Sequence, residues 1–290
     1  MIGIDWGSSS FRAYRISDAG AILETRSAPR GLLNVTDGDF ARVLDEEISE
    51  WRDDAPILMC GMIGSRQGWV EVPYVACPAG PRQLTANVRA VEWRGRRIHI
   101  VPGLSCIDEV GTPDVLRGEE SQIFGALDNL GPGAHWVCLP GTHSKWVRVN
   151  ERRVERFATH MTGELFAVLR DHSILGRMMR GDARDDSAFI AGVTRSGDSG
   201  GLLHHLFGVR AQGLLGQLFN ESSASYLSGL LIGHELRNVK DHSGHINLLG
   251  ATHLVTAYAT ALSALGMRPR VLDPHSVARG LFLLSRKEAA

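Results

Sequence analysis

A pattern of strand, glycine turn and strand occurs twice in this chain, and it constrains the fold more than any other feature. Residues 2–26 read as three short strands, and the first turn between them is Asp5-Trp6-Gly7-Ser8-Ser9-Ser10. Residues 135–159 repeat this order, with Pro140-Gly141-Thr142-His143-Ser144 at the equivalent turn, so that Gly141 falls on Gly7. An internal repeat on this scale predicts two similar α/β domains that face each other.

The remaining segments also alternate between strands and helices, with a mostly helical stretch after residue 185. Apolar spacing predicts helices at 39–51, 188–196, 202–213, 224–239, 254–265 and 276–285, and strands at 57–60, 98–101, 246–249 and 270–272. We expect an N-terminal α/β domain over 1–115 and a C-terminal α/β domain over 116–290. The last helix is expected to pack back on the first domain.

Composition excludes several classes of protein. The 290 residues carry 31 Lys and Arg against 32 Asp and Glu, and a net charge of −1 gives no basic surplus for a nucleic-acid or anionic-membrane partner. No apolar run approaches the roughly 20 residues that span a bilayer. The 4 cysteines are scattered, without a CxxC pair. This usage predicts reduced thiols in a cytoplasmic protein.

The turn after the first strand has the chemistry of a phosphate site. Gly7 allows close approach of the main chain, and Ser8, Ser9 and Ser10 add hydroxyl and N–H donors. Asp5 ends the strand, where a carboxylate can hold Mg²⁺ directly or through water. A plain hairpin turn with a capping Asp explains this motif equally well when it is taken alone. The second copy favours the phosphate interpretation.

Two adjacent carboxylates precede an apolar helix in Arg117-Gly118-Glu119-Glu120-Ser121-Gln122. One of them can act as a general base toward a sugar hydroxyl, and such assistance typically contributes 10²–10⁴-fold to a rate. The alternative is that both simply complement the dipole of the helix.

Two further glycine-rich turns follow predicted strands. Gly250-Ala251-Thr252 opens a helix, where N–H groups can bind a nucleotide. The stretch 60–69 is a glycine-rich loop of the kind that carries binding residues. Either one is also compatible with an ordinary connection. The chain has no P-loop motif, no GxGxxG after a strand and no GxSxG elbow.

Taken together, these motifs resemble the actin-like ATPase fold of sugar kinases, hexokinases and chaperone ATPases. Longer matches sharpen the resemblance, and they are IDWGSS (4–9), CGMIGS to GW (60–69), VPYVACPA (72–79), VPGL (101–104), LRGEESQIFGA (116–126), LPGTHSKWV (139–147), MTGELF (161–166) and LSGLLIGHE (227–235). This set is similar to the 2-dehydro-3-deoxygalactonokinase family over essentially the whole chain. PGTHxKW together with RGEE is more specific than any single glycine turn.

The resemblance implies an α/β, two-domain actin-like fold of the ribonuclease H-like class, with duplicated hairpin phosphate turns and a central cleft. It implies ATP-dependent phosphorylation of 2-dehydro-3-deoxy-D-galactonate to its 6-phosphate, which an aldolase splits in galactonate and galactose catabolism. ATP and Mg²⁺ are the implied cofactors. We also expect the cleft to close on substrate, because water at the γ-phosphate would compete with the sugar hydroxyl.

The resemblance also implies roles for particular residues. Asp5 would orient Mg²⁺, Glu120 is the first choice for the base, and Glu119 is the reserve, in a setting that resembles the glutamate pair of exopolyphosphatases. The nucleotide would contact Gly7, Ser8, Ser9, Ser10, Gly141, Thr142, Ser144, Lys145, Gly250, Ala251 and Thr252. The sugar acid would contact Arg12, Gly64, Ser65, Arg66 and Trp69, with Thr162, Gly163 and Glu164 as a further wall.

Three other functions stay open from the sequence. The chain is compatible with a kinase for another keto-deoxy or aldonic acid, because epimers differ by one hydroxyl orientation. A phosphohydrolase or ATPase would use Glu120 to activate water. A nucleotide-dependent scaffold or sugar sensor is the non-enzymatic alternative. The expected partners are a small sugar acid and ATP, with no nucleic acid and no membrane, and a homodimer is an open possibility.

Overall fold

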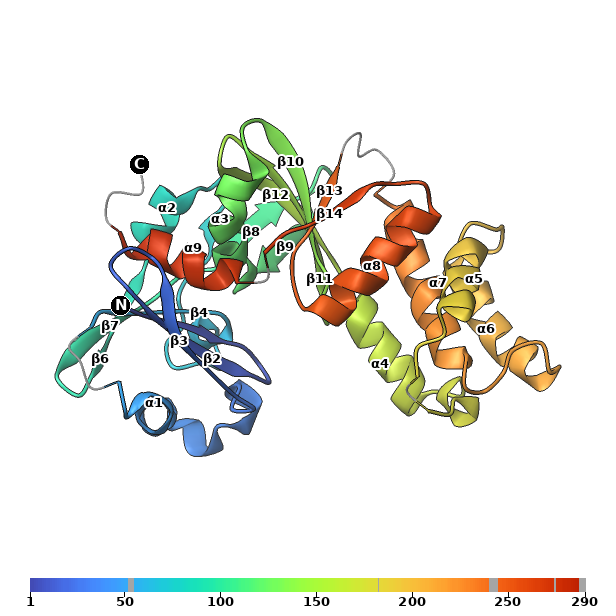
Figure 1. The fold of residues 1–290 in the computed structure, drawn as a ribbon, viewed down its shortest axis with the longest axis horizontal. Coiled ribbons are helices and arrows are strands. Elements are labelled where there is room, and N and C mark those ends of the chain that lie inside the picture. The colour runs from blue at the N-terminus through green and yellow to red at the C-terminus, as the bar shows by residue number, and fades with distance from the viewer. Residues whose placement is uncertain (52–54, 182, 240–244, 274, 287–290) are drawn as a thin grey trace. The chain divides into compact units, whose positions relative to one another are not determined.

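The computed structural model describes residues 1–51, 55–181, 183–239, 245–273 and 275–286, and Figure 1 labels its elements. The chain divides into two compact units. The first unit comprises Met1–Ala134, Val147–Ala158 and Asp273–Ala290, and the second comprises His135–Trp146 and Thr159–Leu272. The first unit therefore extends beyond residue 115, where the sequence suggested its end.

A six-stranded sheet in the order β3-β2-β1-β4-β7-β6 forms the centre of the first unit. β1 (Ile2–Trp6) pairs antiparallel with β2 (Phe11–Ile16) and parallel with β4 (Ile57–Cys60). The other strands are β3 (Ile22–Ala28), β6 (Arg89–Trp93) and β7 (Arg96–Ile100). Successive side chains of a strand point to opposite faces. Ile2, Ile4 and Trp6 thus share one face of β1, and all three are fully buried in the core.

Helix α1 (Phe40–Ile48) covers part of this core. Its apolar residues Phe40, Val43, Leu44 and Ile48 recur at helical spacing and are buried. The Asp39 carboxylate accepts a hydrogen bond from the Arg42 N–H at 3.0 Å, which satisfies one of the free donors at the helix start. Asp39 is therefore the N-cap of α1.

The rest of the first unit contains a three-stranded sheet in the order β5-β8-β9 and three more helices. These elements are β5 (Val75–Ala76), β8 (Leu104–Ile107), β9 (Pro113–Leu116), α2 (Pro81–Thr85), α3 (Glu119–Leu130) and α9 (Ser276–Ser285). Helix α9 packs closely on α3. A Cβ on Gly125 would lie 1.8 Å from the Ser276 carbonyl oxygen, and one on Gly280 would lie 1.8 Å from that of Ser121. Only glycine allows this approach.

A five-stranded sheet in the order β12-β11-β10-β13-β14 reproduces the plan of the first sheet. Its strands are β10 (Ala134–Leu139), β11 (Ser144–Asn150), β12 (Arg153–His160), β13 (Ile246–Leu248) and β14 (Pro269–Val271). As β1 does with β4, β10 pairs in parallel with a strand that comes later in the chain, β13. The predicted repeat therefore appears in the order of the strands as well as in the turns.

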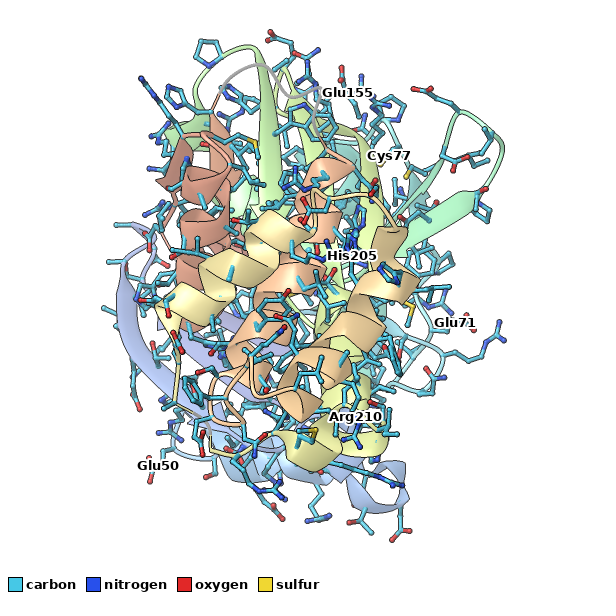
Figure 2. The ribbon with its side chains drawn as sticks, turned by 90° about the vertical axis from the view of Figure 1, so that its right-hand side faces the viewer. Glu50, Glu71, Cys77, Glu155, His205 and Arg210 are labelled. Carbon is cyan, nitrogen blue, oxygen red and sulfur yellow. The ribbon has the colours of Figure 1, made fainter. Side chains whose placement is uncertain are left out.

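The described part of the second unit contains the α-helices α4 (Thr162–His172), α5 (Asp186–Arg195), α6 (Gly201–Leu214), α7 (Ser223–Arg237) and α8 (Thr252–Ala264). Glycines let α5 and α7 touch, because a Cβ on Gly229 would lie 1.9 Å from the Phe189 carbonyl oxygen. His205 of α6, labelled in Figure 2, is buried, and its Nδ1 lies 3.0 Å from Nε2 of His234 on α7. Among the described residues, no helix is both long and apolar enough to span a bilayer.

Candidate active site

The first glycine turn lies between β1 and β2 and presents N–H groups to its exposed side. Its carbonyl groups are engaged, because the Leu32 and Leu33 N–H groups donate to the Gly7 and Ser8 oxygens at 3.0 Å each. Ser8 and Ser9 are exposed, and their N–H groups meet no acceptor in the described part of the chain. Free N–H groups on an exposed turn form an anion-binding concavity.

Gly7 is not required by the fold around it. A Cβ there would meet its nearest neighbour, the Ser10 carbonyl oxygen, at 3.6 Å, and the backbone is not left-handed. Gly31 differs, because a Cβ there would lie 2.3 Å from the Ser8 carbonyl oxygen. A glycine without a steric reason in the protein leaves room for a ligand to approach the main chain.

Asp5 lies opposite Arg12 on β2 and opposite Cys60 on β4. One carboxylate oxygen is 3.8 Å from Arg12 Nη1, and the other is 4.0 Å from the Cys60 sulfur. The pKa of Asp5 is raised to about 6, chiefly by burial. The Arg12 charge lowers this pKa, and the Glu119 carboxylate raises it further. Asp5 and Glu119 are therefore close enough to repel each other.

The two glutamates begin α3 and differ in exposure. Glu120 is fully buried, and its Oε2 accepts the Gly118 N–H at 2.6 Å. Its Oε1 accepts the Ser121 hydroxyl at 3.3 Å. Burial, with the Glu119 charge beside it, raises the pKa of Glu120 to about 8. Glu119 is half-buried, and its Oε2 accepts the Arg117 N–H at 3.0 Å.

These carboxylates fit a divalent cation. Mg²⁺ prefers oxygen ligands, keeps several waters and is commonly bound through one or two carboxylates plus substrate phosphates. A cation at Asp5 would offset the repulsion from Glu119 that raises the pKa of Asp5. Among the described residues, no group of three or more His, Cys, Asp and Glu side chains is arranged as an all-protein metal site.

The glycine-rich loop after β4 lies against the same strand end. A Cβ on Gly61 would lie 2.7 Å from the Trp6 carbonyl oxygen, and one on Gly118 would lie 3.3 Å from Gly61 Cα. Both glycines are left-handed, with φ of 91° and 106°. The loop is thereby fixed beside Asp5 and the start of α3.

The sugar-acid candidates in this region lie in different environments. Gly64 and Ser65 are buried in the loop, and Trp69 is half-buried. The side chain of Arg66 is 83% exposed, and its Nε lies 3.6 Å from a Glu71 carboxylate oxygen. The side chain of Arg12 is half exposed beside Asp5. Sequence reasoning missed Arg117, which is 9% exposed next to Gly64. Its place in the LRGEESQIFGA motif was the available signal.

The second glycine turn resembles the first in its geometry. Gly141 has no close neighbour for a Cβ, the nearest atom being the His143 carbonyl oxygen at 3.6 Å. Helix α4 begins against this turn, because the Glu164 N–H donates to the Thr142 carbonyl at 2.9 Å. A Cβ on Gly163 would lie 2.4 Å from the Gly141 carbonyl oxygen. His143 Nε2 also contacts the Glu164 carboxylate at 2.5 Å.

Ser144 and Lys145, predicted to contact phosphate, are buried at the start of β11. The Ser144 hydroxyl shares a hydrogen bond with the Tyr258 hydroxyl at 2.6 Å. The Lys145 ammonium donates to the Thr159 hydroxyl at 2.8 Å. The structure thus places both side chains within the second unit rather than on the exposed side of the turn.

A buried glutamate that the sequence analysis did not single out connects this region. Glu235 of α7 accepts the Trp146 indole N–H at 2.7 Å through Oε1 and the Tyr258 hydroxyl at 2.7 Å through Oε2. The Thr162 hydroxyl donates to the same Oε2. One side chain therefore ties α4, α7, α8 and β11 together around the second turn.

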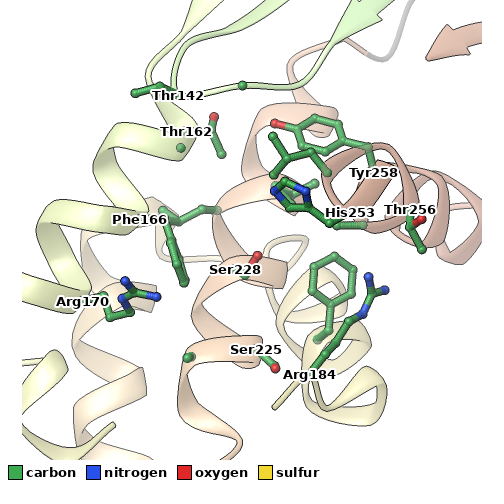
Figure 3. Close-up of a pocket in the computed structure, with 18 of the residues that line it drawn as sticks. Thr142, Thr162, Phe166, Arg170, Arg184, Ser225, Ser228, His253, Thr256 and Tyr258 are labelled. Atoms are coloured by element: carbon green, nitrogen blue, oxygen red, sulfur yellow. The ribbon is translucent and has the colours of Figure 1, made fainter. Parts of the chain in front are cut away.

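A pocket of about 700 Å³ opens beside the second turn. Figure 3 shows Thr142 and Thr162 at one end of it, and Arg170 and Ser225 toward the other. Thr162 and Gly163, expected in the sugar-acid wall, line this pocket together with Gly141 and Thr142. From α8 the lining begins at His253, directly after Gly250, Ala251 and Thr252. Sequence reasoning missed Phe166, Arg170, Arg184, Ser225 and Ser228.

Known proteins match the chain over nearly its whole length. The profile of the 2-keto-3-deoxy-galactonokinase family matches residues 5–284. A 2-dehydro-3-deoxygalactonokinase of Escherichia coli (strain K12) is 37% identical over 91% of this chain and 90% of its own length. A probable 2-dehydro-3-deoxygalactonokinase of Rhizobium meliloti (strain 1021) is 40% identical over 95% of this chain and 93% of its own length.

Solved structures agree on the fold. A crystal structure from Sinorhizobium meliloti, also named for this kinase, has a TM-score of 0.90 and 38% identity, covering 97% of this chain and 96% of its own. The ADPNP-bound activator of 2-hydroxyisocaproyl-CoA dehydratase from Clostridium difficile has a TM-score of 0.53 at 12% identity. It covers 100% of this chain and 96% of its own, and it supports the fold alone.

The two larger sheets share the same strand plan, and the solved structures named above share the fold. Together they define the class of this protein, which is the two-domain actin-like fold of sugar kinases and related ATPases. Within this class, the chain belongs to the 2-keto-3-deoxy-galactonokinase family. The fold class, the family resemblance and the enzyme class expected from the sequence, a sugar-acid kinase, are thereby confirmed.

Proposed function

We propose that the chain transfers the γ-phosphoryl group of ATP to the terminal hydroxyl of 2-dehydro-3-deoxy-D-galactonate, giving the 6-phosphate. The observation that carries this proposal is the family match over residues 5–284, together with Asp5 and two glutamates grouped beside a phosphate-type turn. The reaction belongs to galactonate catabolism. We place it in the cytoplasm, which suits four cysteines that are all free thiols.

The nucleotide would use both glycine turns. The exposed N–H groups around Gly7, Ser8, Ser9 and Ser10 would bind phosphate in the first unit, and those around Gly141 and Thr142 would do so in the second. The pocket beside the second turn has room for adenosine. Gly250, Ala251 and Thr252, which directly precede the lining residue His253, would border the adenosine. Ser144 and Lys145 would position this turn, since both side chains are bonded within the unit.

Mg²⁺ would be held at Asp5, directly or through water, where the neighbouring carboxylate already favours a cation. When bound, this ion neutralises charge on the β- and γ-phosphates. Arg12 Nη1 lies 3.8 Å from the Asp5 carboxylate and would help to position it.

The Glu119–Glu120 pair would accept the proton of the sugar hydroxyl. Sequence reasoning gave Glu120 as the first choice, but its burial and its bonds to Gly118 and Ser121 favour Glu119 as the group that meets the substrate. Glu119 is half-buried and lies near Asp5. Glu120 would then fix the start of α3, which sets the position of Glu119.

ADP release with MgATP tests the reaction directly. The substrates are 2-dehydro-3-deoxy-D-galactonate, its gluconate epimer, galactonate, gluconate and no sugar. Turnover with the first acid alone is the expected result. Equal turnover with both epimers would indicate a broader keto-deoxy acid kinase, and ADP release without sugar would indicate a phosphohydrolase.

Glu119→Gln and Glu120→Gln test the assignment of the base. We expect Glu119→Gln to lower kcat by about 10²–10⁴-fold with the KM for ATP within twofold, because it removes only the proton acceptor. Glu120→Gln should lower kcat much less, and the surface variant Glu92→Gln serves as the matched control. A larger loss in Glu120→Gln than in Glu119→Gln would return the role to Glu120.

A further inference from the structure

Arg117 is a buried cation whose hydrogen bonds are incomplete. Its Nη2 donates to the Val72 carbonyl at 2.7 Å, and its guanidinium carbon lies 4.3 Å from the centre of the Tyr74 ring. Its Nε and Nη1 are buried and have no partner in the described part of the chain. Buried charges in proteins are nearly always paired, because leaving one unpaired is costly.

A second unsatisfied group lies in the neighbouring loop. The Ser65 hydroxyl is also buried without a partner, so three of the five such side-chain atoms among the described residues belong to Ser65 and Arg117. The two residues are linked through Gly64, where a Cβ would lie 3.0 Å from Arg117 Nη1. That Cβ would also lie 3.0 Å from Ile100 and 3.3 Å from Val72, so glycine at position 64 lets the loop pack directly against the guanidinium.

The nearby glutamates do not supply the missing partner. Glu120 is bonded to the Gly118 N–H and the Ser121 hydroxyl, and Glu119 is bonded to the main-chain N–H of Arg117 rather than to its guanidinium. The Arg117 charge opposes the rise in the pKa of Glu120, but the buried Nε and Nη1 of Arg117 form no hydrogen bond with either carboxylate. Its sequence position, two residues before Glu119, places it in the candidate active site.

We propose that Arg117, with the Ser65 hydroxyl, binds the carboxylate of the sugar-acid substrate. A carboxylate supplies the negative charge and the acceptor oxygens that Arg117 lacks, and hydrogen bonds between charged partners are the strong ones. Tyr74, which is 42% exposed, covers the guanidinium and would move to admit the acid. This inference rests on the proposed function, and it names Arg117 rather than Arg66 or Arg12 as the residue that selects an acid over a neutral sugar.

Steady-state kinetics test the site in three variants, Arg117→Met, Arg117→Lys and Ser65→Ala. The matched control is Arg97→Met, at an exposed position. We expect Arg117→Met to raise the KM for the sugar acid by about 10- to 100-fold, since a hydrogen bond to a charged group contributes roughly 1.5–3 kcal/mol. The KM for ATP should stay within twofold. Arg117→Lys should recover part of the loss, and Ser65→Ala should raise the same KM by a few fold. An unchanged KM for the acid in Arg117→Met would overturn the proposal.

Pyruvate provides a readout that does not depend on the identity of the sugar. It carries the same carboxylate and ketone, whereas hydroxyacetone lacks the carboxylate. We expect pyruvate, and not hydroxyacetone, to raise the Tm of the wild-type protein, and we expect Arg117→Met to abolish this shift. If Arg117→Met does not fold, Arg117→Lys and Ser65→Ala carry the test. Stabilisation by pyruvate that persists in all three variants would overturn the proposal.

The two measurements separate this inference from the proposed function. A wild-type protein that does not phosphorylate 2-dehydro-3-deoxy-D-galactonate, yet is stabilised by pyruvate through Arg117, would refute the proposed substrate and retain the carboxylate site. An active wild-type protein whose Arg117 variants bind the acid normally would retain the proposed substrate and refute the carboxylate site.

Discussion

Ionisation of Glu120 makes the stability of the folded protein depend on pH. Its carboxyl group is fully buried at the start of α3, beside Glu119, and its pKa is raised to about 8. An ordinary glutamate in the unfolded chain ionises at about 4.5. Between these two values the folded protein holds a proton that the unfolded chain releases, so stability falls as pH rises through this window.

Glu120→Gln removes this dependence, because the amide cannot ionise. We expect the difference in free energy of unfolding between Glu120→Gln and wild type to be small below pH 4.5. It should grow in favour of the variant up to about pH 8 and then level off. The upper limit is about 5 kcal/mol, since one pKa unit corresponds to about 1.4 kcal/mol. Urea unfolding at intervals from pH 4.5 to 9 measures it, and a difference independent of pH would contradict the expectation.

The sequence alone named the candidate site residues, but it could not show which of them are buried. The paired glutamates, Asp5 and both glycine turns were identifiable because their residue types match phosphate and metal chemistry at strand and helix ends. Which glutamate is buried depends on Gly118 and Ser121, and on the packing behind α3. The pairing of Lys145 with Thr159 depends on the register of two strands. Such contacts are tertiary, so local spacing does not predict them.

The buried Glu235 is the point at which four elements of the second unit are joined. It accepts hydrogen bonds from Trp146 of β11, Thr162 of α4 and Tyr258 of α8. Tyr258 in turn shares a hydrogen bond with Ser144, the residue that follows the second turn. The geometry of the phosphate-type turn is thus set by helices that come much later in the chain.

Replacing Glu235 tests this link between elements. Glu235→Leu leaves three donors without their acceptor, those of the buried Trp146 and Tyr258 and the partly buried Thr162. Each such group costs about 1–3 kcal/mol. We expect a loss of at least about 3 kcal/mol in the free energy of unfolding and a higher KM for ATP. Glu235→Gln should lose less, because hydroxyl groups can turn to accept from an amide. Thermal unfolding and ATP kinetics provide the readouts, and Glu221→Gln, at an exposed position, is the control. A normal KM for ATP in Glu235→Leu would show that the second glycine turn does not depend on Glu235.

Elements with a clear apolar period were predictable, and those without one were not. The strands of both hairpin repeats and the helices α5 to α9 lie within a few residues of their expected bounds. Helix α4 was not predicted; its Leu165, Phe166 and Leu169 pack against a core cluster, but none of its residues is fully buried. Strand β5 has only 2 residues, and in β9 only Leu116 is buried, so neither has a run of buried apolar residues like that of β4.

At the scale of the whole molecule, the first unit is assembled from segments far apart in the sequence. Helix α9 packs on α3 through Gly280 and Gly125, each of which lies against main-chain atoms of the other helix. The contact at Gly280 is with Ser121, one residue after Glu120. Helix α9 therefore supports the helix that begins with the two glutamates.

Gly280→Ala tests this support. Its Cβ would lie 1.8 Å from the Ser121 carbonyl oxygen, so the two helices must separate. We expect a loss of about 1–3 kcal/mol or more in stability, as in other overpacked sites, and a fall in kcat that exceeds any change in the KM for ATP. The control is Gly208→Ala in α6, where the nearest atom is 3.9 Å away and the better helix propensity of Ala should leave stability equal or higher. Equal stability of both variants would show that the α3–α9 contact tolerates a methyl group.

The position of α9 also bears on how the protein is made. A ribosome adds about 5–20 residues per second, so the residues between Ala134 and Ser276 take about 7 to 28 s to synthesise after α3 has been translated. Throughout this interval the glutamate-bearing helix lacks the partner against which Gly125 packs. A nascent chain would thus complete the pocket beside the second turn before Glu119 and Glu120 are fixed in place. We expect it to be unable to consume ATP until residues 276–285 have left the ribosome.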